Sequence, residues 1–202
     1  MLAFTKKEIQ LIKKLNTPAK VQTFLNGLKF NFEKSGETIK SPIMVLRKKN
    51  AHCMEGALLA AYILSMHKFE VYLLCLKVKK GDYDHVITPF KVNGFWGALS
   101  KTNHSVLRYR EPVYKNIREL VMSYFHEYFL NDGEKTLRKY SDLLPLNKIK
   151  GDWATSTENL WYVDDQLEYM KYHDIVPKSH LKKLRKADKI ERKAAMATEY
   201  KP

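Results

Sequence analysis

The chain has 202 residues, 45% of them hydrophobic and 12% aromatic, which suits one domain with a sizeable core and argues against a disordered protein. The formal net charge of +14 favours anionic partners, although a basic surface with no special partner explains it equally well. Two cysteines exclude a disulfide framework. The charged N-terminus is not a signal peptide, and no stretch reaches the roughly 18 apolar residues of a membrane span, so we expect a cytoplasmic protein.

The first quarter of the chain carries four helix starts. Thr5 and Glu8 have the spacing of a capping box, and Thr17 and Ser41 each precede a proline, which the first helical position tolerates. Asn50 is expected to cap a fourth helix that runs to about residue 67. This helix is apolar on nearly all sides, which is typical of a helix buried in a core.

A β-rich region follows the buried helix. The run 69–78 is continuously apolar, as in a strand buried on both faces. Residues 84–92 and 95–100 read as the two strands of a hairpin whose turn is Asn93-Gly94. In that register Val92 lies opposite Phe95, and Ser100 lies diagonally from His85 on the same face.

Helical periodicity returns after Pro112 over residues 117–128, and residues 137–150 show no clear period. Thr155 and Glu158 form a second capping-box pattern, which predicts a helix through residue 170. From Lys178 onward the chain is strongly basic, and we expect a solvated terminal helix. The alternative is that this tail binds nucleic acid or an acidic protein.

The order of elements predicts an α+β fold in which helices pack on one side of a small antiparallel sheet. We expect a single domain over residues 1–177, with its core at about 41–130. Residues 178–202 would form a basic helical tail.

The chemistry of the chain centres on Cys53 and His85. A thiol near a helix N-terminus and beside an imidazolium has a lowered pKa, and the thiolate is the nucleophilic form of cysteine. Because no carboxylate lies on the expected face of the hairpin, the group that orients His85 would be Ser100 or Thr102. Cys75 lies inside the apolar strand and is expected to belong to the core.

The succession of a cysteine at a core-helix start, a strand, the run Asp84-His85-Val86 and a hairpin resembles the transglutaminase-like branch of the papain-like superfamily. The resemblance covers about residues 41–105 and implies a papain/transglutaminase-like core with Cys53 as nucleophile and His85 as its partner. That family places an aspartate on the next strand. Here Ser100 stands at its position.

Other polar residues near these positions are candidates for the cleft: His52, Glu55, Thr102, Asn103, His104 and Arg108. Glu55 stands in the first turn of the buried helix, where a carboxylate favours the helix dipole, and the alternative is a pair with Arg108. No spacing of metal ligands and no phosphate-binding glycine loop is present, so we expect neither a metal nor a cofactor.

Two functional hypotheses follow. The first is a cysteine-dependent hydrolase or acyltransferase that forms a thioester on Cys53, with His85 as general acid and base, and acts on a peptide, protein or small amide or ester. The second is a binding module that has kept this fold without the chemistry and engages an acidic protein or nucleic acid. The missing acid at Ser100 favours the second, and the pairing of thiol and imidazole favours the first.

Overall fold

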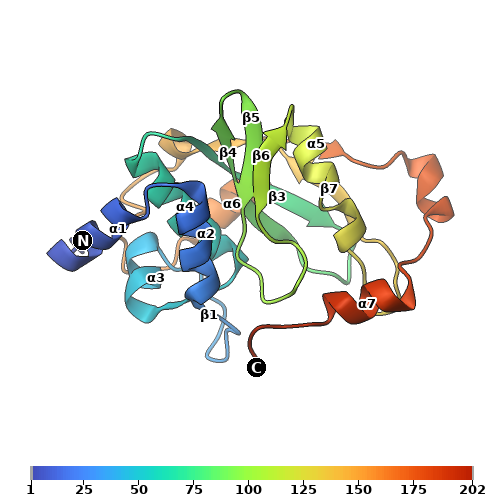
Figure 1. Cartoon of the computed structure of the whole chain (residues 1–202), viewed down its shortest axis with the longest axis horizontal. Coiled ribbons are helices and arrows are strands. Elements are labelled where there is room, and N and C mark those ends of the chain that lie inside the picture. Colours follow the sequence, from blue (N-terminus) through green and yellow to red (C-terminus); the bar gives the residue numbers. More distant parts are fainter. Residues whose placement is uncertain (1, 202) are drawn as a thin grey trace.

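The computed structural model describes residues 2–201 and shows an α+β protein built around a seven-stranded antiparallel sheet (Figure 1). The strands run in the order β6-β5-β4-β3-β7-β9, and β8 also pairs with β3. Their bounds are β3 Glu70–Val78, β4 His85–Val92, β5 Phe95–Leu99, β6 Arg110–Tyr114, β7 Leu137–Ser141, β8 Leu144–Pro145 and β9 Tyr172–Asp174. A separate parallel pair is formed by β1 (Lys29–Phe30) and β2 (Asn50–Ala51).

The α-helices are α1 Lys6–Lys14, α2 Pro18–Gly27, α3 Pro42–Lys48, α4 Cys53–Met66, α5 Ile117–Met122, α6 Trp161–Glu168 and α7 Lys189–Ala195. Short 3-10 turns lie at Phe125–Glu127, Leu146–Lys148 and Lys178–Lys183. The predicted starts of α1, α2 and α3 are confirmed. Thr5, Thr17 and Ser41 each accept a hydrogen bond from a backbone N–H in the first turn.

The predicted hairpin is also confirmed, in register as well as in position. Val92 pairs with Phe95 and Thr88 pairs with Leu99, and Asn93 and Gly94 both have positive φ. Asn93 and Gly94 therefore form the turn that the sequence indicated, because few other residue pairs tolerate that backbone.

The sheet is larger than expected, because four further strands extend it beyond the predicted three. β7 and β8 arise from the region that showed no clear period, and β9 is only three residues long. β3 accepts β7 and β8 on the edge opposite β4, and this places the apolar run of β3 inside the sheet. Short strands of this kind carry too few residues for a periodic pattern to stand out.

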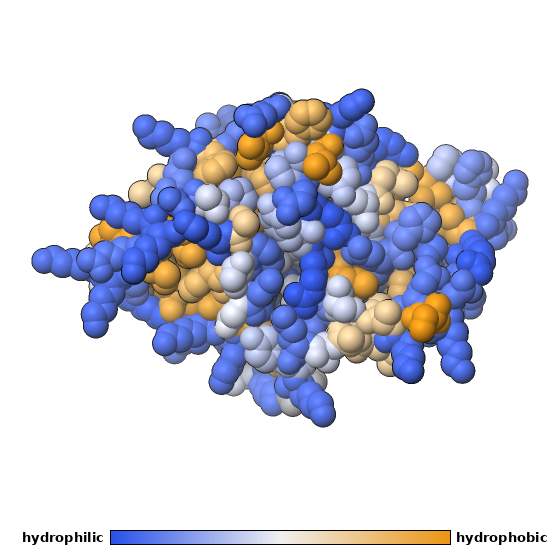
Figure 2. All heavy atoms as spheres, in the orientation of Figure 1, coloured by the Kyte–Doolittle hydropathy of each residue, from blue (hydrophilic) through white to orange (hydrophobic). Residues whose placement is uncertain are grey.

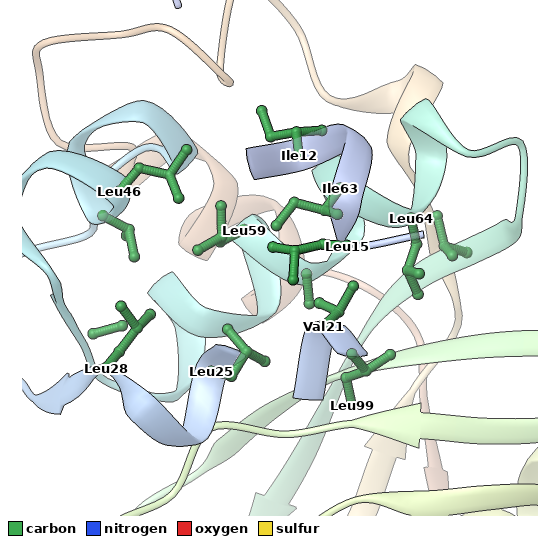
Figure 3. Packing of buried hydrophobic residues seen from close by; sticks show 14 of the residues in the cluster. Ile12, Leu15, Val21, Leu25, Leu28, Leu46, Leu59, Ile63, Leu64 and Leu99 are labelled. Atoms are coloured by element: carbon green, nitrogen blue, oxygen red, sulfur yellow. The ribbon is translucent and has the colours of Figure 1, made fainter. Parts of the chain in front are cut away.

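The buried helix α4 starts later than expected. Asn50 does not cap it but pairs in β2, and His52 is the residue before its first turn, so Cys53 is the first helical residue. Helices α1 to α4 gather on one side of the sheet (Figure 1), where α4 carries much of one apolar cluster. Figure 3 shows this cluster, with Ile63 and Leu59 of α4 facing Val21 and Leu25 of α2.

Helices cover both faces of the sheet, which corrects the expectation that they lie on one side. Leu73 and Cys75 of β3 pack with α4, whereas Leu74 and Leu76 pack with α5 and the turn that follows it. The alternation follows from the strand period of two. β3 is therefore buried on both faces, as its continuous apolar run predicted.

The helix predicted from Thr155 and Glu158 is wrong at its start, since α6 begins only at Trp161. The segment before α6, residues 154–160, instead forms hydrogen bonds with the chain at the start of α3. Ser41 donates its hydroxyl to the carbonyl of Ser156 (2.6 Å), and the amide of Leu160 donates to the carbonyl of Ile39 (2.9 Å). These long-range hydrogen bonds keep the backbone out of a helix.

The basic C-terminal segment contains the expected helix only as the short α7, and most of its side chains are exposed, but it is not a free tail. It crosses the molecule and lies against the loop between β5 and β6, at the lower edge of Figure 1. The amide of Glu199 donates to the carbonyl of Asn103 (2.9 Å), and the Ser105 hydroxyl donates to the carbonyl of Ala194 (2.6 Å). The segment is therefore part of the folded unit.

The face of the molecule shown in Figure 2 is mostly hydrophilic, with apolar patches separated by hydrophilic side chains. Within residues 2–201, no helix is long and apolar enough to cross a membrane.

Candidate active site

Cys53 stands where three features meet. It is the first residue of α4, it is partly exposed, and it lies in the wall of a cavity of about 580 Å³. The first N–H groups of a helix have no partner within the helix, and the positive end of the helix dipole lies there. The position therefore favours a negative charge on the sulfur and on an oxygen beside it.

Two imidazoles act on this thiol. Burial raises the pKa of Cys53, but hydrogen bonds with His52 and then with His85, together with their positive charges, hold that pKa well below its usual value. The thiol is therefore poised to ionise at neutral pH, which is the condition for a nucleophilic cysteine.

His85 is the first residue of β4 and is held by the adjacent strand. Its Nε2 lies 2.7 Å from Oγ of Ser100, which follows the last residue of β5. The Ser100 hydroxyl donates to the carbonyl of Leu107 (2.5 Å), so its oxygen accepts from Nε2–H of His85. This leaves Nδ1 of His85 as the nitrogen for Cys53.

His52 supplies a second imidazole whose surroundings are more acidic than those of His85. Its Nε2 donates to the carbonyl of Thr38 (2.7 Å) and lies 3.5 Å from Oε1 of Glu55 and 3.7 Å from Oε1 of Glu33. Burial lowers the pKa of His52. The hydrogen bond with Cys53 and the negative charges of Cys53 and Glu55 outweigh burial and raise this pKa to about 9. Glu33 and Glu55 therefore accompany His52, whereas Asp84, which precedes His85 in sequence, pairs with Lys77 (2.9 Å).

Glu55 is fully buried and holds the entrance to α4. It accepts from the amide of His52 (3.0 Å), from the Thr38 hydroxyl (2.7 Å) and from the amide of Lys40 (3.0 Å). Its ion-pair partner is Nζ of Lys40, at 3.0 Å. The alternative pairing with Arg108 is wrong, because Arg108 pairs with Glu199 (3.4 Å).

The cavity that contains Cys53 has walls from distant parts of the chain. His52, His85, Thr102, Asn103 and His104 all line it, so the structure brings most of the predicted cleft residues together. Glu55 and Arg108 do not line it. Ser100 lies behind His85 and is almost fully buried.

Thr102 and Asn103 have structural partners in this wall. Oγ1 of Thr102 accepts from the amide of His104 (3.1 Å) and does not orient His85. The side chain of Asn103 exchanges two hydrogen bonds with the backbone of Tyr200, each of 2.9 Å. Asn103 therefore holds the C-terminal segment beside the cavity.

A second cavity, of about 340 Å³, is also lined by Cys53. His52, Tyr83 and Asp84 line both cavities, so the thiol lies at their junction. The acidic residues of the second cavity are Glu33, Glu37, Asp84, Asp164 and Glu168.

No protein-family model and no curated protein matches this chain.

Several residues of the site were not identified from the sequence. Lys101 is fully buried in the cavity wall and donates to the carbonyl of Leu28 (2.5 Å), and burial lowers its pKa to about 8. Tyr128 lines the cavity from the turn after α5, and Arg192 does so from α7. They lie far from Cys53 in sequence, and only the fold brings them to it.

Cys75 is an internal reference for Cys53. It is buried against α4, and burial raises its pKa to about 12. Across residues 2–201, no group of three or more potential metal ligands is assembled. Of the two thiols, Cys53 alone combines exposure with a lowered pKa.

Proposed function

We propose that this chain is a cysteine-dependent hydrolase or acyltransferase that acts on amides or esters through a thioester on Cys53. One observation carries the proposal: the Cys53 thiol begins a buried helix, opens to a cavity and is flanked by the imidazoles of His52 and His85. The sequence resemblance to transglutaminase-like proteins of the papain-like superfamily supports the same chemistry.

The steps follow from the geometry. The Cys53 thiolate would attack the carbonyl carbon of the substrate and form a carbon–sulfur bond, while the π electrons move to the carbonyl oxygen. As the carbonyl re-forms, the bond to the leaving amine or alcohol breaks, and imidazolium His85 gives that group a proton. Water or an amine would then attack the thioester, with neutral His85 as the base, and release Cys53.

Ser100 stands where transglutaminase-like proteins have an aspartate, and it would take over only one of the functions of that aspartate, the orientation of the histidine. It accepts from Nε2 of His85 and so fixes the ring orientation and tautomer. It adds no negative charge beside His85. Glu33 and Glu55 lie beside His52, so His52 would keep its proton while His85 acts as the acid and base.

A two-part experiment tests the proposal. Iodoacetamide labelling of the native protein, followed by peptide mapping, should modify Cys53 at neutral pH much faster than Cys75. Incubation with p-nitrophenyl acetate should release a burst of p-nitrophenolate equal to the enzyme concentration and leave an acetyl group on Cys53. Cys53→Ala should abolish the burst, and Cys75→Ala should keep it.

The competing hypothesis of a binding module without chemistry predicts a different result. An ordinary alkylation rate at Cys53, unchanged in His85→Ala, would sink the enzyme proposal. Adding a primary amine to the acetylated protein separates the two reaction types. Faster deacetylation with formation of the acetylated amine indicates transfer, and no effect indicates hydrolysis.

We also propose, independently of the catalytic function, that the basic C-terminal segment binds an anionic partner. Because the segment is packed on the cavity wall, deletion would disturb the site. Replacing the exposed Lys182 and Lys183 by serine is the cleaner test. Binding to a polyanion that weakens in high salt and in this variant would support the partner.

A further inference from the structure

The cavity beside Cys53 contains a hydrogen-bond donor that the protein itself does not use. Tyr128 is 4% exposed and forms part of the cavity wall. Within residues 2–201, its hydroxyl is buried and has no hydrogen-bond partner. An unpaired buried hydroxyl costs free energy, so a partner supplied by a ligand would be favoured there.

Tyr128 and the reacting thiol of Cys53 line the same cavity. Burial raises the pKa of Tyr128 well above its usual value, and the negative charge at Cys53 is the largest of the charges that raise it further. The hydroxyl therefore stays protonated and is a donor at any physiological pH. His52 and His85 favour the charged form of the thiol, and no hydrogen bond in residues 2–201 engages the Tyr128 hydroxyl, so it is left for another acceptor.

The ring of Tyr128 is held in place before any ligand arrives. The amide of Thr136 donates to the carbonyl of Tyr128 (3.1 Å), and a β-bridge between Phe129 and Lys135 closes the same turn. The ring packs in the apolar cluster that also contains Tyr124 and Leu137. A donor fixed in this way needs no reorganisation during a reaction, which is the property that makes such groups effective.

We propose that the Tyr128 hydroxyl is a catalytic residue that donates a hydrogen bond to the carbonyl oxygen of the acyl group attacked by Cys53. This inference rests on the proposed function. When sulfur bonds to the carbonyl carbon, the displaced π pair gives the oxygen a negative charge. Tyr128 donates to that oxygen, and the N–H groups of Cys53 and Met54 at the start of α4 are further donors to it. No proton is transferred, and the hydrogen bond weakens when the carbonyl re-forms.

The inference also defines the class of ligand. A donor that stays protonated, beside a nucleophilic thiol, selects a neutral carbonyl that becomes an oxyanion. The acyl groups of amides, esters and thioesters meet this requirement. Alkylating agents such as iodoacetamide do not use it, because displacement of iodide at a saturated carbon forms no oxyanion.

That difference supplies the test. Tyr128→Phe should lower the rate of Cys53 acylation by p-nitrophenyl acetate roughly 100-fold, the usual effect of losing one oxyanion donor. Its rate of alkylation by iodoacetamide should equal that of the wild type. Because the hydroxyl has no partner in the free protein, the melting temperature should stay the same or rise.

Tyr124→Phe is the matched control. Tyr124 is fully buried in the same cluster, but its hydroxyl donates to the carbonyl of Arg108 (3.1 Å). This variant should lose melting temperature because it leaves that carbonyl without its donor, and it should keep the acylation rate. The two variants therefore separate a role in chemistry from a role in packing.

Three other results would contradict the catalytic role of Tyr128. Unchanged acylation in Tyr128→Phe overturns the inference and leaves the proposed function standing. Equal losses of acylation and alkylation mean that Tyr128 acts on the thiol and not on an oxyanion. A wild-type protein that gives no burst dependent on Cys53 overturns the proposed function and this inference together.

Discussion

Nε2 of His85 lies 2.7 Å from Oγ of Ser100, and the Ser100 hydroxyl donates a hydrogen bond to the carbonyl of Leu107 (2.5 Å). A serine therefore occupies the position from which a carboxylate would orient a catalytic histidine. Because its hydroxyl donates to Leu107, its oxygen can only accept from His85. The backbone of Ser100 is itself fixed by two hydrogen bonds with the side chain of Gln22, of 2.8 and 3.0 Å. His85 is thus oriented through neutral groups.

The first prediction concerns this orientation. Ser100→Ala removes the acceptor of His85, and a neutral hydrogen bond of this kind contributes about 1 kcal/mol, so acylation of Cys53 should fall several-fold. The loss should appear in the rate of the acetylation burst and in its pH profile. Alkylation should change less, because His52 still stabilises the thiolate. An acylation rate equal to that of the wild type would show that Ser100 has no positioning role.

The hairpin explains why this relationship could be predicted from the sequence. Asn93 and Gly94 fix the turn, and a fixed turn sets every pair along both strands, so the proximity of Ser100 to His85 followed. The role of His52 could not be predicted in the same way. It depends on the carbonyl of Thr38, which lies in a loop without a repeating pattern.

Segments that are joined by long-range hydrogen bonds were the least predictable part of the fold. Residues 154–160 carry a capping-box pattern but bind the chain before and within α3, because Ser41 and Ile39 offer them partners. The C-terminal segment has a helical charge pattern, yet Asn103 and Ser105 bind its backbone. Local sequence contains no information about such partners.

The second prediction concerns His52 and pH. His52→Gln removes the larger of the two hydrogen-bonding effects that lower the pKa of Cys53, so the pH midpoint of iodoacetamide alkylation should move upward. His67→Gln is the control, since Nε2 of His67 also meets a backbone carbonyl, that of Ile12 (2.8 Å), at the other end of α4. An unchanged midpoint in His52→Gln would mean that His85 alone ionises the thiol.

His52 should also leave a signature in stability. Its pKa in the folded protein is raised to about 9, so its protonated form stabilises the fold. That contribution is complete below the usual histidine pKa and is lost as pH rises to about 9. The lowered pKa of Cys53 adds stability over the same interval and offsets this loss in the wild type. The His52 contribution should therefore appear in urea unfolding as a stability advantage of the wild type over His52→Gln that shrinks as pH rises through this interval.

The third prediction concerns Glu55. Glu55→Ala leaves Lys40 and the amide of His52 without their buried partner, and loss of one member of a buried pair costs about 3 kcal/mol or more. The matched control is Glu8→Ala, which breaks the capping box of α1 and a surface pair with Arg47 at a cost of about 1 kcal/mol. Denaturant midpoints measure both losses. Equal losses would contradict the role given to Glu55.

The pH dependence of the same residue has the opposite sign to that of His52. Burial raises the pKa of Glu55, but the charge of His52 and the donors Thr38 and Lys40 lower it below its usual value. Its contribution is therefore present above the usual carboxyl pKa and is lost as pH falls through the lowered one. Glu55→Gln should show a smaller loss of stability in acid than the wild type.

The fourth prediction concerns the C-terminal segment. Gly133 has φ +88°, and a Cβ at this position would lie 2.7 Å from the carbonyl oxygen of Ala187 and 3.2 Å from its nitrogen. The amide of Ala187 also donates to the carbonyl of Gly133 (2.8 Å). Gly133→Ala should therefore push the segment away from the turn, and trypsin should cleave after Lys186 and Lys189 faster than in the wild type.

Gly36→Ala is the control that separates the steric clash with Ala187 from the strain of a positive φ. Gly36 has φ +108°, and a Cβ there would meet no atom within 4 Å, so the substitution carries the conformational cost of about 1 kcal/mol without displacing a neighbour. Its C-terminal segment should stay protected from trypsin. Because Ala195 and Met196 form part of the cavity wall, Gly133→Ala should also speed the alkylation of Cys53, and Gly36→Ala should not. Equal protection of the segment in the two variants would show that Gly133 does not hold it.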